Sequence, residues 1–397
     1  MKKILALLLA VVMAAAFASC GSNETDDGKG DAKADDFKIG LICLHDENST
    51  YDNNFIQALK SVQKELNLTD DQVLIKTNIG EDDSCYTAAA ELVDKGCKVI
   101  FADSFGHESY ILQAAKEFKD VQFCHATGTK AHTEKLANFH NAFADIYQGR
   151  YLAGVAAGMK LNQMIEEGKI TADKAVIGYV GAFNYAEVVS GMTSFYLGAR
   201  SICPSATMKV TYTNSWFDIA LEREAALNLI NNGCALISQH ADSMGAPSAC
   251  EEKGVPNVSY NGSTVTSCPD TFIVSSAINW APYMLYISEC VIKGEAIAVD
   301  WCGGIAEGSV VLSDINGKAA AKGTKEALDA AVAKFKAGTL HVFNTETFTV
   351  EGKKLESFKC EDTTEVIKDG YFAESVARSA PYFEFNIDGI EFLNTKF

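Results

Sequence analysis

Four hydrogen-bonding side chains close one apolar run of this sequence: Gln239, His240, Asp242 and Ser243 follow ALIS at 235–238. A strand that ends in such side chains is placed to bind the polar edge of a small molecule. His240 and Asp242 could also form a catalytic base, but the chain has no G-x-S-x-G nucleophile motif, so we favour binding over catalysis. Asn261, which follows another expected strand, is suited to an amide or hydroxyl contact.

Two aromatic residues, Tyr51 and Trp216, stand in corresponding loops after expected strands, where a ring has no strand core to fill. Such a pair could hold a flat ligand between two rings. The alternative is that each ring folds back onto the neighbouring surface. Asp52, Asn53 and Asp218 flank the rings and could accept hydrogen bonds from a ligand. The competing role for these residues is helix N-capping, above all for Asp218, which directly precedes an amphipathic stretch.

Charge and motif content exclude several other chemistries. Against 52 Asp and Glu there are 34 Lys and Arg, which gives a formal net charge of -18 and no basic stripe for nucleic acid. The seven histidines form neither H-x-H nor H-E-x-x-H, and the glycines at 303–304 lack the following Lys-Ser/Thr of a phosphate loop. We therefore expect no metal site and no cofactor.

Cysteine is frequent, but its spacing is not that of a metal or redox motif. The chain has 12 cysteines and no C-x-x-C pair. Cys43, Cys97, Cys124 and Cys234 lie within apolar segments, which favours small buried hydrophobic side chains over disulfide bridges or metal ligands.

The elements that must position these residues alternate along the chain. Apolar runs typical of buried strands lie at 37–44, 73–78, 99–103, 121–126, 175–183, 208–214, 235–241 and 257–260. Amphipathic stretches typical of helices lie at 55–67, 85–96, 108–118, 188–200 and 219–231. This alternation indicates an α/β fold with parallel sheets. Two such series, joined by a helical stretch at 144–167, predict two similar lobes with a cleft between the carboxyl ends of their strands.

The N-terminus has the pattern of an export signal. Two lysines precede an apolar stretch at 4–17, and small residues precede Cys20, so we expect a signal peptide over residues 1–19. The apolar stretch is short for a bilayer, although a permanent transmembrane helix is the alternative. Residues 20–36 start with this cysteine, and the residues after it include no aromatic or β-branched apolar side chain that a core could bury. This composition predicts a flexible tether.

Four longer stretches carry a family resemblance: FADIYQGRYLAGVAAG (143–158), GYVGAFNYAEVVSGMTSFYLGAR (178–200), NSWFDIALEREAALNLINNGCALISQHADS (214–243) and INWAPY (278–283). They resemble the basic membrane protein (BMP) family of substrate-binding lipoproteins of ABC importers, in particular its purine nucleoside receptor-like branch. The residues before Cys20 similarly resemble a lipobox, which implies that this cysteine is acylated, for example with palmitate.

The resemblance implies a type I periplasmic-binding-protein fold, in which two Rossmann-like lobes are connected by crossing strands and enclose a ligand cleft. By position, it implies that Tyr51 and Trp216 stack on a purine. The resemblance also implies that five side chains contact the base or the sugar: Asn53, Gln239, His240, Asp242 and Asn261. We expect residues 37–143 with about 262–300 in lobe 1, and residues 144–261 with about 301–397 in lobe 2 and a C-terminal extension.

The expected function is that of a transport receptor, not an enzyme. The protein would be anchored by lipid on the extracytoplasmic face of the cell membrane, capture a purine nucleobase or nucleoside, and deliver it to the permease and ATPase subunits of an ABC importer. Two alternatives remain open at this point: a purine-handling hydrolase that uses His240 and Asp242, and a tethered ligand sensor for a signalling receptor.

Overall fold

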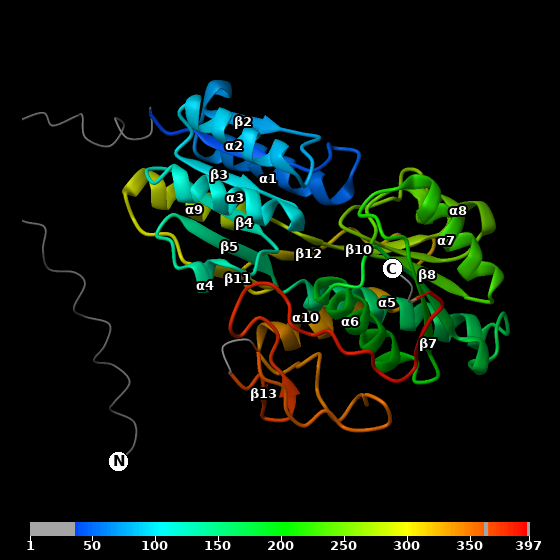
Figure 1. Ribbon diagram of the computed structural model, residues 1–397. Helices are drawn as coiled ribbons and strands as arrows, with labels where there is room; N and C mark the ends of the chain where they lie inside the picture. Colours follow the sequence, from blue (N-terminus) through cyan, green and yellow to red (C-terminus); the bar gives the residue numbers. More distant parts are fainter. Residues whose placement is uncertain (1–35, 361–363, 395–397) are drawn as a thin grey trace, which may run out of the picture. The chain divides into compact units, whose positions relative to one another are not determined.

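The first α/β series forms a six-stranded parallel sheet. In the computed structural model, which describes residues 36–360 and 364–394, the strand order is β11-β5-β4-β3-β1-β2 (Figure 1). The signal peptide and Cys20 predicted above lie outside these residues. The strands are β1 (Ile39–Ile42), β2 (Val73–Lys76), β3 (Val99–Ala102), β4 (Gln122–Ala126), β5 (Phe139–Ala144) and β11 (Asp300–Gly303).

Helices cover both faces of this sheet, because its strands are apolar on both sides. In β3, Val99 and Phe101 face the core that includes Phe55 and Trp280, whereas Ile100 and Ala102 face the opposite core. The helices of this first lobe are α1 (Thr50–Glu65), α2 (Asp83–Asp94), α3 (Glu108–Glu117), α4 (Ala131–Glu134) and α9 (Ala281–Lys293), and α1 with α9 supplies the first of the two cores.

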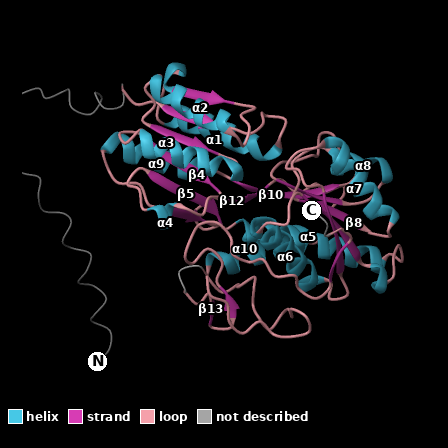
Figure 2. Ribbon diagram, viewed as in Figure 1, coloured by secondary structure: helices cyan, strands magenta, loops and turns pink. Residues whose placement is uncertain are grey.

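The second α/β series forms a seven-stranded sheet of order β12-β10-β9-β8-β6-β7-β15, of which β8, β10 and β12 are labelled in Figure 2. All pairs of neighbouring strands in this sheet are parallel except one, because β12 is antiparallel to β10. The strands are β6 (Val176–Gly181), β7 (Thr207–Tyr212), β8 (Leu236–Gln239), β9 (Asn257–Tyr260), β10 (Phe272–Ile278), β12 (Val310–Leu312) and β15 (Ile390–Phe392). The helices are α5 (Ile146–Glu166), α6 (Ala186–Ile202), α7 (Ile219–Asn231), α8 (Gly245–Lys253) and α10 (Thr324–Lys336).

Helices α5 and α6 pack closely against each other because glycines stand at their crossing. A Cβ atom on Gly154 would lie 1.9 Å from the carbonyl oxygen of Phe195, and one on Gly198 would lie 2.1 Å from that of Tyr151. Both distances are far below van der Waals contact, so only glycine fits at either position.

Three connections pass between the sheets: β5 to α5, β10 to α9, and β11 to β12. The second of them corrects a predicted boundary. Residues 262–300 were expected in lobe 1, but β10 pairs with β9 of the second sheet, and the chain returns to the first lobe only after Ile278. The physical reason is that a buried strand must satisfy its backbone groups, and β9 offers the free edge of the second sheet.

The C-terminal residues extend the second lobe. Residues 340–385 contain the two-stranded sheet β13 (Ile367–Lys368) and β14 (Tyr371–Phe372), and β15 then completes the edge of the large sheet beside β7. Five phenylalanines form the core of this extension: Phe343, Phe358, Phe372, Phe383 and Phe385.

The cysteines behave as small core residues, as predicted. Cys43, Cys97, Cys124 and Cys234 are buried, and each of the eleven cysteines in the described part of the chain has a free thiol. Within the same residues, no helix has the length and apolar character that crossing a bilayer would require.

Candidate ligand-binding site

A small cavity lies between the carboxyl ends of the strands of both sheets, where the sequence predicted a cleft. Its lining comes from loops after β1, β3 and β4 in the first lobe and after β6, β7 and β8 in the second. The lining residues are Leu44, His45, Tyr51, Asp52, Ser104, Phe105, Thr127, Glu187, Trp216, His240 and Asp242.

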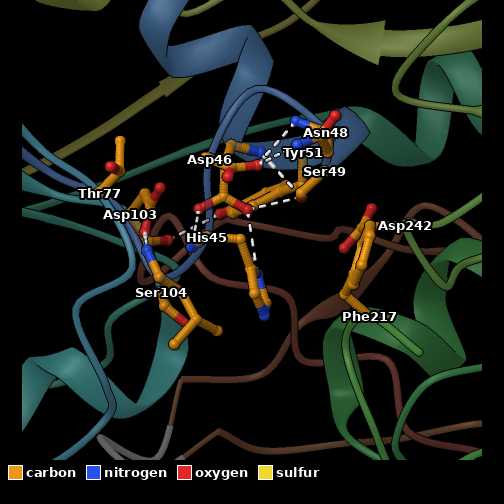
Figure 3. A network of polar contacts seen from close by, with 12 residues as sticks. His45, Asp46, Asn48, Ser49, Tyr51, Thr77, Asp103, Ser104, Phe217 and Asp242 are labelled. Atoms are coloured by element: carbon orange, nitrogen blue, oxygen red, sulfur yellow. Dashed lines mark hydrogen bonds and ion pairs between the residues drawn. The ribbon is translucent and has the colours of Figure 1, made fainter. Parts of the chain in front are cut away.

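Asp52 is held in the first turn of α1 by a hydrogen-bond network, of which Figure 3 labels His45 and Ser49. Its carboxylate accepts the N–H of His45 at 2.8 Å and the hydroxyl group of Ser49 at 2.6 Å, and His45 Nδ1 lies 3.4 Å away. Ser49 is also the N-cap of this helix. Although burial opposes ionisation, these hydrogen bonds hold the pKa of Asp52 below its usual range, so the group is an anionic acceptor.

Tyr51 contributes its ring to the lining while its hydroxyl group is fixed within the first lobe. The hydroxyl donates to the carbonyl oxygen of Asp103 at 2.9 Å, and the ring packs edge-on against Phe55 at 5.0 Å between centroids. Burial raises the pKa of this phenol well above its ordinary value. The ring therefore occupies one defined position at the cavity.

In the second lobe, Trp216 belongs to a group of rings at the cavity. Phe183 packs edge-on against Trp216 at 4.8 Å, and Tyr185 stacks on Phe183 at 5.1 Å. Tyr185 also stacks on Phe105 of the first lobe at 5.1 Å. Phe105 and Tyr185 are 40% and 41% exposed, so this contact between the lobes is accessible from solvent.

His240, Glu187 and Asp242 form the polar side of the second lobe. His240 Nε2 lies 3.6 Å from Glu187 Oε1, and burial lowers the pKa of this histidine, which favours the neutral ring. Asp242 Oδ1 accepts a hydrogen bond from Asn261 Nδ2 at 3.0 Å, and burial raises the pKa of this carboxyl group well above its usual value. Donors and acceptors are thus both available at the cavity wall.

Of the nine predicted contact residues, five line the cavity: Tyr51, Asp52, Trp216, His240 and Asp242. The other four have different partners. Asp218 caps α7 by accepting the N–H groups of Ala220 and Leu221, both at 2.9 Å, so the capping role proves correct for this residue.

The remaining three serve the scaffold behind the cavity. Asn53 accepts a hydrogen bond from Gln57 Nε2 at 3.1 Å on the surface of α1. Gln239 is buried in β8 and accepts from Asn257 Nδ2 at 2.9 Å. Asn261 adopts a left-handed backbone (φ 60°) and orients Asp242 instead of lining the cavity. None of these three side chains lines the cavity in this structure, and their contact with a ligand stays a prediction.

Six further residues line the cavity that were not predicted as ligand contacts: Leu44, His45, Ser104, Phe105, Thr127 and Glu187. All lie in or next to loops that follow strands at the carboxyl edges of the two sheets. That position was the available signal, although it does not tell which side chains of a loop face inward.

The two lobes touch each other around the cavity. Asn54 Nδ2 donates to the carbonyl oxygen of Asn261 at 3.0 Å, and the rings of His45 and Phe217 lie 5.4 Å apart (Figure 3). The enclosed cavity has a volume of only about 20 Å³, whereas pockets for small molecules usually measure about 300–1,000 Å³. A ligand can therefore enter only when the lobes separate and the lining side chains rearrange.

One group of side chains in the described residues has donor atoms close enough for a metal ion: Cys43, Asp52 and Asp103, within 4.8 Å of one another. However, Asp52 already accepts hydrogen bonds from His45 and Ser49. Of this group, Asp52 is thus already engaged in the hydrogen-bond network described above.

Comparison with known proteins gives one family match along most of the chain. The model of the Bmp family, described as "ABC transporter substrate-binding protein PnrA-like", matches residues 42–336. A purine-binding protein of Brucella abortus (strain 2308) is 30% identical over 309 residues, which are 77% of this chain and 83% of that protein. A Haloferax volcanii protein named as an ABC transporter glucose-binding protein is 34% identical over 216 residues, 54% of this chain and 51% of its own length.

Solved structures resemble this chain in fold. A solute-binding protein of an ABC transporter system from Conexibacter woesei DSM 14684 has a TM-score of 0.62 at 20% identity, covering 77% of this chain and 98% of that one. A Bacillus halodurans structure described as a transcriptional activator of the comK gene has a TM-score of 0.61 at 16% identity, covering 75% and 97%. Together with the two parallel sheets, these similarities confirm the type I periplasmic-binding-protein fold.

Proposed function

Because this chain belongs to the Bmp family of substrate-binding proteins of ABC transporters, we propose that the cavity between its lobes takes a purine base or nucleoside. The observation that carries this proposal is the convergence of rings and hydrogen-bonding groups from both lobes on one cavity. The 30% identity to a purine-binding protein supports the same ligand class.

Stacking and hydrogen bonding would contribute differently to binding. A purine presents two flat faces, and stacking on an aromatic side chain contributes about 1–3 kcal/mol per base. Tyr51, Phe105 and Trp216 offer such surfaces. Selectivity would come from the polar wall, since a buried group left unpaired by the wrong ligand costs about 1–3 kcal/mol. The carboxylate of Asp52 accepts from ligand N–H or O–H groups, and His240 can donate to a ring nitrogen or carbonyl oxygen.

Closure of the two lobes around the ligand would connect binding to transport. Substrate-binding proteins of this family deliver a small molecule to permease and ATPase subunits. Closing two lobes by a hinge motion excludes water from the ligand and creates a surface that exists only in the loaded form. No reaction of the ligand is required, and we propose that none occurs.

We further propose that the protein is attached to the outer face of the cell membrane through an acylated Cys20. The support is the sequence pattern of residues 1–20 and the polar composition of residues 21–36 that follow, which predicts a tether. The net charge of -18 would not attract the protein to an anionic membrane surface, so the lipid must supply the attachment. Replacing Cys20 with Ser should move the protein from the membrane fraction to the soluble extracytoplasmic fraction.

The ligand class is tested by a thermal-shift panel of nucleobases, nucleosides, amino acids and sugars. A ligand that binds only the folded protein stabilises it by RT ln(1+[L]/Kd). A shift confined to purines is the expected result, and comparison of bases with nucleosides separates these two. A shift with glucose or other sugars alone would instead favour the ligand class named for the Haloferax volcanii relative.

The hydrolase alternative receives no support from the site geometry. Asp242 Oδ1 binds Asn261, and the carboxylate that lies 3.6 Å from His240 Nε2 is that of Glu187, so the His240–Asp242 pair expected of a catalytic base is not formed. Incubation with inosine and adenosine should release no free base. Turnover that His240→Ala abolishes would replace the receptor assignment with an enzymatic one.

A further inference from the structure

A second buried carboxyl group lies directly behind Asp52. Asp103 follows β3, and its side chain is 0% exposed, while Asp52 is 1% exposed. Carboxylate oxygens of the two residues lie within 4.8 Å of each other, and Figure 3 shows Asp103 beside the network of His45 and Ser49. Only Asp52 lines the cavity.

The two carboxyl groups have different hydrogen-bond partners. Asp52 receives donors on both oxygens, from the His45 N–H and the Ser49 hydroxyl group. Asp103 Oδ1 accepts the N–H of Leu44 at 3.1 Å, but Asp103 Oδ2 is buried without a hydrogen-bond partner. An ionised carboxylate in that position would leave a buried charge uncompensated, which is costly.

His107 does not supply the missing positive charge. Its Nδ1 lies 3.8 Å from Asp103 Oδ1, but this nitrogen accepts the N–H of Ser104 at 3.4 Å. Its Nε2 lies 2.9 Å from the carbonyl oxygen of Ile79 and must donate there. The ring is therefore neutral, in agreement with burial that lowers the pKa of His107, and no proton remains for Asp103.

The other titratable groups around the pair are neutral or acidic. The thiol of Cys43, which directly follows β1, lies within 4.8 Å of both carboxyl groups, and burial raises the pKa of this thiol. From the loop before α2, Glu81 binds Ser104 at 2.6 Å. Across the cavity stand the carboxyl groups of Glu187 and Asp242. Three more titratable groups lie at this point: the ring of His45 and the carboxyl group of Asp46 beside Asp52, and the phenol of Tyr51, whose hydroxyl group donates to the carbonyl oxygen of Asp103.

Two buried carboxyl groups this close cannot both ionise without strong repulsion. In other proteins, such pairs of carboxyl groups share one proton. We propose that Asp103 is a positioning residue that keeps one proton between itself and Asp52, so that Asp52 presents a fixed anionic acceptor to the ligand. This inference rests on the proposed ligand site. In agreement with it, burial and then the charge of Asp52 raise the pKa of Asp103 well above its usual range.

The proposal predicts that ligand affinity depends on pH through this pair. At high pH the shared proton is lost, and repulsion between the two carboxylates displaces Asp52 from its network. Asp103→Asn should remove this dependence, because the amide N–H of asparagine donates to Asp52 at every pH. Asp52→Asn should also give a flat pH profile, but with weaker binding throughout.

Isothermal titration calorimetry with adenine and adenosine, from about pH 6 to about pH 9, tests the proposal. For the wild-type protein we expect the affinity to fall at least about tenfold over this range. For Asp103→Asn we expect a change of less than about threefold. Asp300→Asn is the control: Asp300 is a partly buried aspartate of the first lobe that accepts a hydrogen bond from Ser379 outside the cavity, and this variant should follow the wild-type profile.

Urea unfolding without ligand separates failure of this proposal from failure of the ligand assignment. Asp103 binds its proton more tightly in the folded state, so its stabilising effect is complete below the usual aspartate pKa and is lost as pH rises. The wild-type protein should therefore lose stability with pH relative to Asp103→Asn. If the wild-type protein loses stability in this way but binds no purine, the shared proton is supported and the proposed ligand class is wrong. Identical pH profiles of wild type and Asp103→Asn would overturn the pair itself.

Discussion

Thr50 of the first lobe and Asp242 of the second are joined by two hydrogen bonds beside the cavity. The N–H and the hydroxyl group of Thr50 both donate to the carbonyl oxygen of Asp242, at 3.2 and 3.1 Å. Thr50 opens α1, which carries Tyr51 and Asp52, and Asp242 follows β8 together with His240. Contact between the lobes and assembly of the cavity lining are therefore linked.

Thr50→Val should weaken ligand binding without unfolding the protein. The substitution keeps the shape of the side chain and removes one hydrogen bond of the closed form, which contributes about 0.5–1.5 kcal/mol. The dissociation constant should rise about two- to tenfold. Titration calorimetry measures this change, and Thr87→Val provides the control, since the Thr87 hydroxyl binds only within α2. An unchanged constant would mean that this contact does not stabilise the closed form.

Trp216→Ala should lower purine affinity at least about tenfold, because loss of a stacking ring removes more than about 1.4 kcal/mol. The ring lines the cavity from the second lobe and is itself held by Phe183. Trp216→Phe keeps an aromatic face and should retain most of the affinity. Equal affinity of the wild-type and alanine proteins would rule out stacking on this residue.

The stability of the protein should decline between about pH 5 and about pH 8. Glu374 of the C-terminal extension is buried and accepts hydrogen bonds from Ser190 and Phe383, and burial raises its pKa from 4.5 to about 7. The folded state therefore binds this proton more tightly than the unfolded state, and the stabilisation is lost as pH rises through 7. The full effect is roughly 3 kcal/mol.

Urea unfolding at several pH values measures this decline, with Glu374→Gln as the test variant and the exposed Glu356→Gln as its control. Glu374→Gln should flatten the pH dependence, whereas Glu356→Gln should retain the wild-type curve. The same slope in all three proteins would show that other groups cause the decline.

Much of the fold could be predicted because its signals are local. The apolar runs of β1 and β3 and the amphipathic stretch of α1 predict the βαβ repetition. This prediction does not require knowledge of which distant residues these elements contact. The boundary after β10 could not be predicted in this way. Phe272–Ile278 is apolar enough for either lobe, and only its pairing with β9 decides between them.

The site was predictable as a set of loops but not residue by residue. Side chains alternate along a strand and turn by about 100° per residue on a helix. Gln239 is therefore buried against Asn257 while its neighbour His240 reaches the cavity, and Asn53 turns to the surface of α1 while Asp52 points inward. Asp103 could not be identified at all, because its role depends on the distance to Asp52.

The close contact of α5 and α6 supplies a final test, independent of the ligand. Gly198→Ala would place a Cβ atom 2.1 Å from the carbonyl oxygen of Tyr151, so the two helices must move apart. Overpacking of this kind costs about 1–3 kcal/mol, and more where backbone must shift. Gly317→Ala is the matched control, because its Cβ would meet no atom within 4 Å. Thermal unfolding should give a melting temperature several degrees lower for Gly198→Ala and nearly unchanged for Gly317→Ala. Equal melting temperatures would show that these helices are less closely packed than described.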